Sequence, residues 1–245
     1  MVPLLRLLCR GAALLLVPAA GVPAAVLALV GARPAALRLL CAAGAAALGL
    51  KVVRTGPVPP RGSLLVANHV GYLDILVLGA TVTGRFVAKS EVAGWPALGP
   101  LARFLGTIFI ERERPRAVRQ TVERLARKLA RGERILLFPE GGVNPAGRGL
   151  LAFRAMLFES SLRSGAPCVP VALCYTFPAD PRVWGWIDEP RILRHLRRRV
   201  FPAGEIRVEL RFGEPLAPLP GEGRKELAER ARGEVLRLLS HEGAP

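Results

Sequence analysis

Short apolar runs of strand length alternate with helix-length patterns through most of residues 63–239. The expected strands are 63–67, 85–88, 107–110, 134–138, 169–174 and 206–212, and the expected helices are 73–80, 98–105, 116–131, 152–164 and 225–239. The segment 116–131 repeats apolar residues at spacings of three and four, which is typical of an amphipathic helix. Strands separated by helices predict an α/β fold in which a mainly parallel sheet is flanked by helices on both faces.

The strand expected at 206–212 differs from the others because it alternates polar and apolar side chains. Such alternation is typical of a strand with one solvated face, so we expect it to be exposed or at an edge. Residues 55–62 read TGPVPPRG, a proline- and glycine-rich run that predicts a linker. With 245 residues, the chain holds one sizeable domain and a short appendage. We therefore expect N-terminal membrane-associated helices in 1–54 and an α/β domain in 55–245.

The N-terminal segment is strongly apolar, and residues 11–32 are 22 positions without a charge. That length is enough to cross the core of a bilayer, although Pro18 and Pro23 disfavour a straight helix. Residues 34–50 form a second apolar stretch that only Arg38 interrupts. We therefore expect an apolar helical hairpin, either as transmembrane helices or in the interface. A cleavable signal peptide is the rival interpretation, and the second stretch argues against it.

The chain carries 35 Lys and Arg against 19 Asp and Glu, a formal net charge of +16. Such a charge predicts an anionic partner: a membrane surface, a small anionic substrate or a nucleic acid. Few aromatic residues lie among the basic ones, so a nucleic acid is disfavoured. The cysteines have no zinc-ligand spacing, so we expect buried thiols in a reducing compartment and no bound metal. They are Cys9, Cys41, Cys168 and Cys174.

The first motif with chemical content is NHVGYLD at 68–74, directly after an expected strand. In one unbroken helix, His69 and Asp74 would lie roughly 140° apart around the axis and would not meet. They can meet if His69 lies in the turn before the helix and Asp74 about one turn inside it, and Gly71 makes such a turn easy. Asp74 would then hold one imidazole nitrogen and leave the other as a base. A surface histidine and an unrelated aspartate are the alternative that this spacing alone leaves open.

Three further motifs stand at expected strands. GTIFIER at 106–112 delivers Arg112 to the carboxyl end of a strand, where ligands bind in open α/β sheets, and the planar fork of arginine suits phosphate. FPEGG at 138–142 places Glu140 beside two glycines whose backbone N–H groups can approach a ligand. VPVAL at 169–173 is a buried strand with a proline near its start. Each motif alone is also compatible with solvated charge, an ordinary turn or a core strand.

Taken in order, the four motifs resemble the four blocks of the glycerolipid acyltransferase family, and they are most similar to those of its bacterial 1-acylglycerol-3-phosphate acyltransferases. The resemblance runs from about residue 50 to residue 173, and 85–112, with Lys89, is similar to the family between its first two blocks. It implies transfer of a fatty acyl group from acyl-CoA or acyl-carrier protein to the sn-2 hydroxyl of lysophosphatidic acid, forming phosphatidic acid in phospholipid synthesis. No cofactor is implied beyond the acyl donor.

The resemblance also implies roles for single residues. His69 would be the general base and Asp74 its orienting partner. The implied substrate-binding residues are Asn68, Lys89, Arg112, Glu140, Gly141 and Pro170. Together with the apolar N-terminus, the resemblance implies a bacterial inner-membrane enzyme whose active site faces the cytoplasm.

Two departures from the family pattern bear on the acceptor. Where the third block commonly continues Thr-Arg-Ser, residues 142–144 read GVN, so a phosphate-binding arginine is missing from its usual place. Arg148 and Arg154 are the candidate substitutes. Gly71 stands where the family usually has serine. A different lysolipid, such as lyso-ornithine lipid, is therefore the alternative acceptor.

Two other classes compete with an acyltransferase. A hydrolase with a His–Asp pair is disfavoured because the chain has no Gly-x-Ser-x-Gly elbow. A non-catalytic basic membrane-binding protein is the second rival, since the basic segment 191–199 suits anionic headgroups. We expect His195, within that segment, on a solvated helix face, and His241 to be inert. In an acyltransferase, N–H groups at the start of the helix after His69 are candidates to stabilise the oxyanion.

Overall fold

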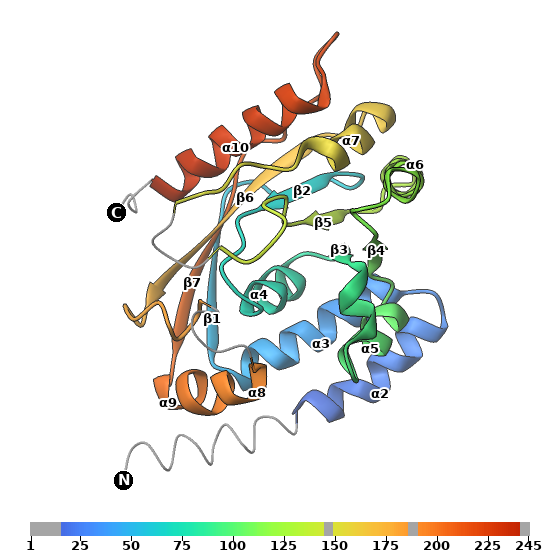
Figure 1. Ribbon diagram of the computed structural model, residues 1–245. Coiled ribbons are helices and arrows are strands. Elements are labelled where there is room, and N and C mark those ends of the chain that lie inside the picture. The colour runs from blue at the N-terminus through green and yellow to red at the C-terminus, as the bar shows by residue number, and fades with distance from the viewer. Residues whose placement is uncertain (1–15, 145–148, 186–190, 241–245) are drawn as a thin grey trace.

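The computed structural model describes residues 16–144, 149–185 and 191–240. Its centre is a seven-stranded sheet in the order β1-β7-β6-β2-β5-β3-β4 (Figure 1). The strands are β1 (Leu50–Thr55), β2 (Leu64–Ala67), β3 (Arg85–Lys89), β4 (Ile108–Ile110), β5 (Ile135–Leu137), β6 (Cys168–Phe177) and β7 (Ile206–Phe212). All neighbouring strands are parallel except β6 and β7, which confirms the predicted mainly parallel sheet.

Helices cover both faces of this sheet, as predicted (Figure 1). They are α2 (Leu16–Leu29), α3 (Arg33–Ala47), α4 (Leu73–Thr81), η1 (Ser90–Gly94), α5 (Leu98–Phe104), α6 (Pro115–Ala130), η2 (Ala155–Phe158), α7 (Glu159–Ser164), α8 (Ile192–His195), η3 (Leu196–Val200), α9 (Phe201–Ala203) and α10 (Arg224–Ser240). The expected helix 152–164 is shorter than predicted, because its first turn is the 3-10 segment η2 and only α7 is α-helical.

Two apolar cores lie on the two faces of the sheet, and β2 contributes to both. Leu65 and Ala67 pack in the core that includes α3 and α4, whereas Leu64 and Val66 pack in the core that includes α6 and α10. Successive side chains of a strand point to opposite faces, so a four-residue strand can be buried on both. This double burial holds the carboxyl end of β2, where the first motif begins, in a fixed place.

The position of β7 corrects the prediction that 206–212 is exposed or at an edge. The strand lies inside the sheet, between β1 and β6. Ile206, Val208 and Leu210 are fully buried, while Arg207 is exposed. The alternation does indicate that one face of the strand is more polar. However, β1 pairs with the outer side of β7 along most of its length and is itself the edge strand. We did not predict β1, because it follows an apolar helix with only two residues between them.

The N-terminal helices α2 and α3 form the predicted hairpin, and α3 packs on α4 (Figure 1). The approach of α3 to α4 is close, since a Cβ at Gly79 would lie 2.6 Å from the Cys41 sulfur. Val22 and Leu29 on α2 remain 72% and 76% exposed. Within the described ranges, no helix is both long and apolar enough to cross a membrane. Residues 11–15 of the predicted apolar span lie outside those ranges.

Candidate active site

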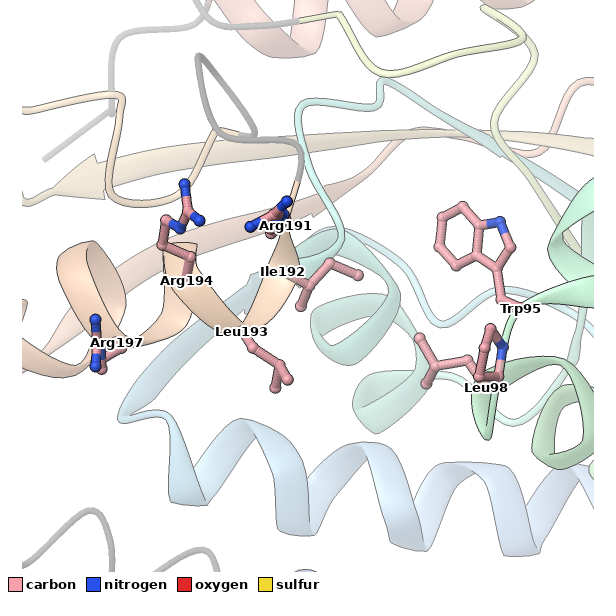
Figure 2. Close-up of a pocket in the computed structure, with 8 residues that line it drawn as sticks. Trp95, Leu98, Arg191, Ile192, Leu193, Arg194 and Arg197 are labelled. Atoms are coloured by element: carbon pink, nitrogen blue, oxygen red, sulfur yellow. The ribbon is translucent and has the colours of Figure 1, made fainter.

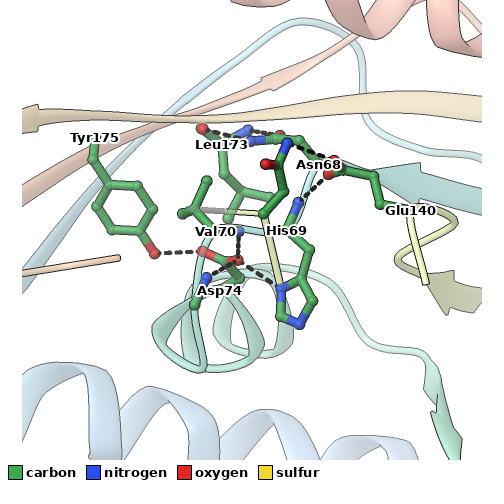
Figure 3. A network of polar contacts seen from close by, with 9 residues as sticks. Asn68, His69, Val70, Asp74, Glu140, Leu173 and Tyr175 are labelled. Atoms are coloured by element: carbon green, nitrogen blue, oxygen red, sulfur yellow. Dashed lines mark hydrogen bonds and ion pairs between the residues drawn. The ribbon is translucent and has the colours of Figure 1, made fainter. Parts of the chain in front are cut away.

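His69 and Asp74 meet where β2 gives way to α4 (Figure 3). His69 lies in the loop after β2, and Asp74 is in the first turn of α4. The His69 Nδ1 and Asp74 Oδ2 atoms are 2.8 Å apart. Of the two arrangements that the spacing left open, the structure thus has the one in which the turn before the helix brings the pair together. The Asp74 side chain is fully buried, while the His69 side chain is 15% exposed.

Asp74 accepts hydrogen bonds on both carboxylate oxygens. Besides His69 Nδ1, its Oδ2 accepts from the backbone N–H groups of Val70 at 2.7 Å and Gly71 at 2.9 Å. Its Oδ1 accepts from the Tyr175 hydroxyl at 2.7 Å. Val70 and Gly71 thus already donate to Asp74, and stabilisation of an oxyanion by N–H groups near the start of α4 stays a prediction.

These contacts set the tautomer of His69. A carboxylate can only accept, so His69 Nδ1 is the protonated ring nitrogen and Nε2 carries the lone pair. Within the described part of the chain, Nε2 has no hydrogen-bond partner. The imidazole also stacks on Phe138, with ring centroids 4.1 Å apart and planes at 15°. The ring is thus held at one nitrogen and one face, with its basic nitrogen left unbonded.

Tyr175 is the contact of Asp74 that the sequence analysis missed. It lies on β6, and its ring stacks on Trp184 with centroids 4.9 Å apart. Burial raises the pKa of the Tyr175 hydroxyl well above its usual value, and the negative charge of Asp74 raises it further. The hydroxyl therefore stays a donor over the physiological range. The predicted strand ended at Cys174, one residue short of it, although an extension with the same alternation would have placed it on the α4 face.

Asn68 joins the ends of β2 and β6. Its Nδ2 donates to the Leu173 carbonyl oxygen at 3.1 Å, and its Oδ1 accepts from the Leu173 N–H at 2.8 Å. Both ends of the amide are therefore bonded to the backbone of β6, and the side chain is buried. In this structure Asn68, predicted to bind substrate, fixes the strand end that precedes His69.

Glu140 supports the His69 loop from the neighbouring strand, because it follows β5. Its Oε1 accepts from the His69 backbone N–H at 2.9 Å, and its Oε2 accepts from Asn144 Nδ2 at 2.9 Å and the Leu151 N–H at 3.0 Å. Asn144 returns the contact through its own N–H, which donates to the His69 carbonyl oxygen at 2.6 Å. The buried Glu140 carboxylate, predicted to bind the acceptor, thus has three donors from the protein itself.

Positive charge gathers beside Gly141. Arg112 follows β4 at the carboxyl edge, as predicted, and its Nη1 donates to the Gly141 carbonyl oxygen at 2.5 Å. Gly141 has a φ of +84°, and a Cβ there would lie 2.3 Å from Arg154 Nε, so only glycine fits between the two arginines. Burial lowers the pKa of the Arg112 guanidinium, and the charge of Arg154 lowers it further.

A cavity of about 190 Å³ at this point is lined by four cations and three carboxylates: Lys89, Arg112, Arg114, Arg154, Glu91, Glu111 and Glu113. The structure therefore brings together three of the cations that the sequence singled out. Arg148, the other candidate substitute for the missing arginine, lies outside the described residues.

Two further residues named in the sequence analysis, Pro170 and His195, do not line the cavity at Gly141. Pro170 is buried in β6, where the register pairs it with Val66, three residues before His69. His195, expected on a solvated helix face, is instead 1% exposed. Its Nδ1 is 2.8 Å from the Tyr72 hydroxyl, and its Nε2 is 2.8 Å from the Arg182 carbonyl oxygen. The basic residues on either side of His195 favoured a solvated helix face, so the sequence did not predict that His195 is buried.

The mainly parallel sheet thus brings a His–Asp pair and several cations together at its carboxyl edge, where open α/β sheets bind ligands. The acyltransferase family model matches residues 50–174, from β1 through most of β6. The chain therefore belongs to this acyltransferase family.

Relatives of two kinds match the chain. A 1-acyl-sn-glycerol-3-phosphate acyltransferase of Neisseria gonorrhoeae is 40% identical over 128 residues, which are 52% of this chain and 50% of that protein. A lyso-ornithine lipid O-acyltransferase of Pseudomonas aeruginosa is 37% identical over 204 residues, which are 82% of this chain and 76% of that protein. The chain thus spans about half the length of the Neisseria relative and three quarters of the Pseudomonas one.

A solved structure shares the fold. The 1-acyl-sn-glycerophosphate acyltransferase of Thermotoga maritima matches with a TM-score of 0.62 and 24% identity. The match covers 87% of this chain and 85% of that one. The likeness includes most of the described elements and supports the architecture given above.

Proposed function

We propose that the protein transfers a fatty acyl group from an acyl-CoA or acyl-carrier protein thioester to the free sn-2 hydroxyl of lysophosphatidic acid, forming phosphatidic acid. The observation that carries this proposal is the His69 imidazole, which buried Asp74 holds at Nδ1 while no described residue bonds to Nε2. Membership of the acyltransferase family supplies the reaction class. The Neisseria relative supplies the acceptor to test first.

The reaction follows from the protonation state of His69. Nε2 removes the proton from the acceptor hydroxyl as its oxygen attacks the thioester carbonyl carbon, and such a base contributes about 10²–10⁴-fold. The Asp74 carboxylate stabilises the imidazolium that forms. When the tetrahedral intermediate collapses, the C–S bond breaks and the thiolate sulfur takes a proton from the imidazolium. The products are the new ester and a free thiol, and the histidine is neutral again.

Arg112 and Arg154 are the residues we assign to the acceptor's anionic headgroup. They stand on either side of Gly141, where the charge of Arg154 disfavours that of Arg112, while Glu91 and Glu113 favour it. Guanidinium groups match phosphate oxygens in paired hydrogen bonds. Arg154 would thus substitute for the arginine missing at Val143.

A lyso-ornithine lipid acceptor is the second candidate, and one observation favours it. The lyso-ornithine lipid acyltransferases of Pseudomonas aeruginosa and Rhodobacter capsulatus align with 82% and 78% of this chain, whereas the Neisseria relative aligns with 52%. The chemistry at His69 is unchanged in this case, because a hydroxyl is acylated in both. Only the contacts of the headgroup differ.

The test follows thiol release from acyl-CoA by the purified protein in detergent, with acyl-carrier protein as the second donor. Lysophosphatidic acid, lyso-ornithine lipid and lysophosphatidylethanolamine are compared as acceptors. Turnover with lysophosphatidic acid that Arg154→Ala weakens at least tenfold, through KM for the acceptor, supports the proposal. Turnover with lyso-ornithine lipid alone would show that this lipid is the acceptor, while the proposed mechanism at His69 would stand. Silence with every donor and acceptor would favour a non-catalytic membrane-binding protein.

We propose the cytoplasmic face of the bacterial inner membrane as the site of action, since both donors are cytoplasmic. A cavity of about 650 Å³ supports membrane contact: Trp95 and Leu98 lie on one side of it, and Leu193 lies on the other with Arg191, Arg194 and Arg197 (Figure 2). Leu193 is 81% exposed. Exposed apolar side chains beside arginines suit a lipid interface. Sedimentation with anionic vesicles, reduced by Leu193→Glu, tests this location.

A further inference from the structure

A further cavity at the carboxyl edge of the sheet, called the second cavity below, adjoins the cavity at Gly141 and shares Arg112 and Arg154 with it. It measures about 670 Å³ and lies among α6, η2, α7 and the start of α10. Its floor is apolar and is formed by Val118, Val122, Leu137, Met156 and Leu157. Arg112, Arg154 and Phe138 also line it, and the Phe138 ring stacks on His69. The cavity therefore reaches the residues that hold the proposed base.

Four cations stand around this floor on three separate helices. They are Arg119 of α6, Arg163 of α7 and Arg224 and Lys225 of α10, named here the rim cations. One carboxylate lines the same cavity, Glu159, and it pairs with Arg163 at 2.9 Å. In the described ranges, the other three rim cations form no ion pair with a carboxylate.

This arrangement differs from an ordinary charged helix face. Solvated charges usually alternate in sign along one helix, whereas the rim cations come from three helices and converge on one apolar hollow. Three of the four cations have no ion pair with a described carboxylate, so together they raise the local positive potential, which attracts an anion. An apolar floor below them adds contact for a carbon chain. The ligand expected here is an amphiphile with a phosphate group.

The proposed reaction has two substrates with a phosphate, and the acceptor headgroup is already assigned to Arg112 and Arg154. We infer that the second cavity binds the phosphopantetheine arm of the acyl donor, with its phosphate at the rim cations and its pantetheine chain along the apolar floor. This inference rests on the proposed function. The arm is common to acyl-CoA and acyl-carrier protein, so the cavity fits either donor.

The test is a binding titration, which does not depend on turnover. Pantetheine, 4′-phosphopantetheine, 3′-dephospho-CoA and CoA are titrated calorimetrically into the detergent-purified full chain. We expect 4′-phosphopantetheine to bind at least tenfold more tightly than pantetheine, because charge-assisted hydrogen bonds to phosphate are strong. Equal binding of the two would overturn the inference. So would a preference that depends only on the 3′-phosphate of CoA.

Variants localise the effect. The double substitution Arg224→Ala with Lys225→Ala is expected to reduce the tenfold preference for 4′-phosphopantetheine to about twofold. The matched control is Arg127→Ala with Arg131→Ala, two exposed arginines that do not line the cavity. Circular dichroism melting checks that both double variants fold. An unchanged preference in the Arg224 and Lys225 variant would overturn the assignment.

Turnover then separates donor from acceptor and one carrier from the other. In the Arg224 and Lys225 variant, KM should rise for the acyl donor and stay constant for the acceptor. A rise in KM for the acceptor alone would show that the cavity binds the lysolipid, which contradicts the inference. Titration with CoA and with holo-acyl-carrier protein identifies which carrier delivers the arm, and binding of neither would refute it. Tight 4′-phosphopantetheine binding without any turnover would instead count against the proposed function.

Discussion

Two histidines of this protein are each held at Nδ1, and comparing them shows what a base requires. His69 Nδ1 donates to the Asp74 carboxylate, and its Nε2 is unbonded within the described residues. His195 lies the other way round: a carbonyl only accepts, so its Nε2 donates to Arg182 and its Nδ1 accepts from the Tyr72 hydroxyl. The two also differ in exposure, since the His69 side chain is 15% exposed and His195 only 1%. His195 has no nitrogen left for a substrate, whereas His69 keeps one.

The largest expected effect is on His69. His69→Ala removes the proposed general base, so kcat should fall by about 10²–10⁴-fold. Thiol release measured at saturating donor and acceptor checks this, with the melting temperature as a control for folding. A loss of less than about fivefold would contradict the assignment of the base.

Asp74→Asn comes next, because an amide cannot accept from all the donors that face Asp74. Its NH2 group would face the Val70 and Gly71 N–H groups or the Tyr175 hydroxyl, which are also donors. The tautomer of His69 with a proton on Nδ1 would then no longer be favoured. We expect kcat to fall by roughly 10²–10³-fold and stability to fall by about 1–3 kcal/mol. Kinetics and urea unfolding measure the two losses. Wild-type kcat with lower stability would show that Asp74 is structural alone.

Tyr175→Phe should have an intermediate effect. It leaves Asp74 Oδ1 without its Tyr175 donor, so the carboxylate is held less firmly in line with His69 Nδ1, and for this geometric reason we expect kcat to fall about tenfold with little change in KM for either substrate. The hydroxyl disperses negative charge on Asp74. Without it the carboxylate stabilises the imidazolium more strongly, so the acid limb of the pH–rate profile should move to higher pH. The profile is measured for kcat/KM, and an unmoved limb with reduced kcat would indicate a packing role only.

Tyr72→Phe is the matched control and the smallest expected effect. It removes a hydroxyl from His195 and leaves the Asp74 contacts in place. Activity should stay within about twofold and the acid limb should not move, while stability falls by about 1 kcal/mol because His195 loses one neutral hydrogen bond. A large loss of kcat here would mean that the two histidines are coupled, and the comparison above would fail.

Local features were the ones that the sequence predicted well. The His69–Asp74 contact spans five residues of a strand, turn and helix, so backbone geometry alone limits where the two side chains can lie. The arrival of Arg112 at the carboxyl edge follows equally from one strand. The alternation of strands and helices is also a local signal, and it predicted the sheet and its helical layers.

Contacts between residues of different strands could not be predicted from local sequence patterns. Tyr175 is 101 positions from Asp74, and Glu140 is 71 positions from His69. These contacts depend on which strands are neighbours in the sheet. The order β6-β2-β5 cannot be predicted from the sequence of any single strand. The edge position expected for β7 failed for the same reason, since its outer partner β1 lies more than 150 residues earlier in the chain.

The strand β6 carries two supports of the site on one stretch of backbone: Leu173 binds Asn68, and Tyr175 binds Asp74. Consecutive side chains of a strand face opposite ways, so deleting or inserting one residue within 168–174 would turn Tyr175 away from Asp74. The segment should therefore accept many exchanges of one apolar residue for another but no change in its length. In a mutational scan, single-residue indels here should be as damaging to activity as loss of Tyr175 itself.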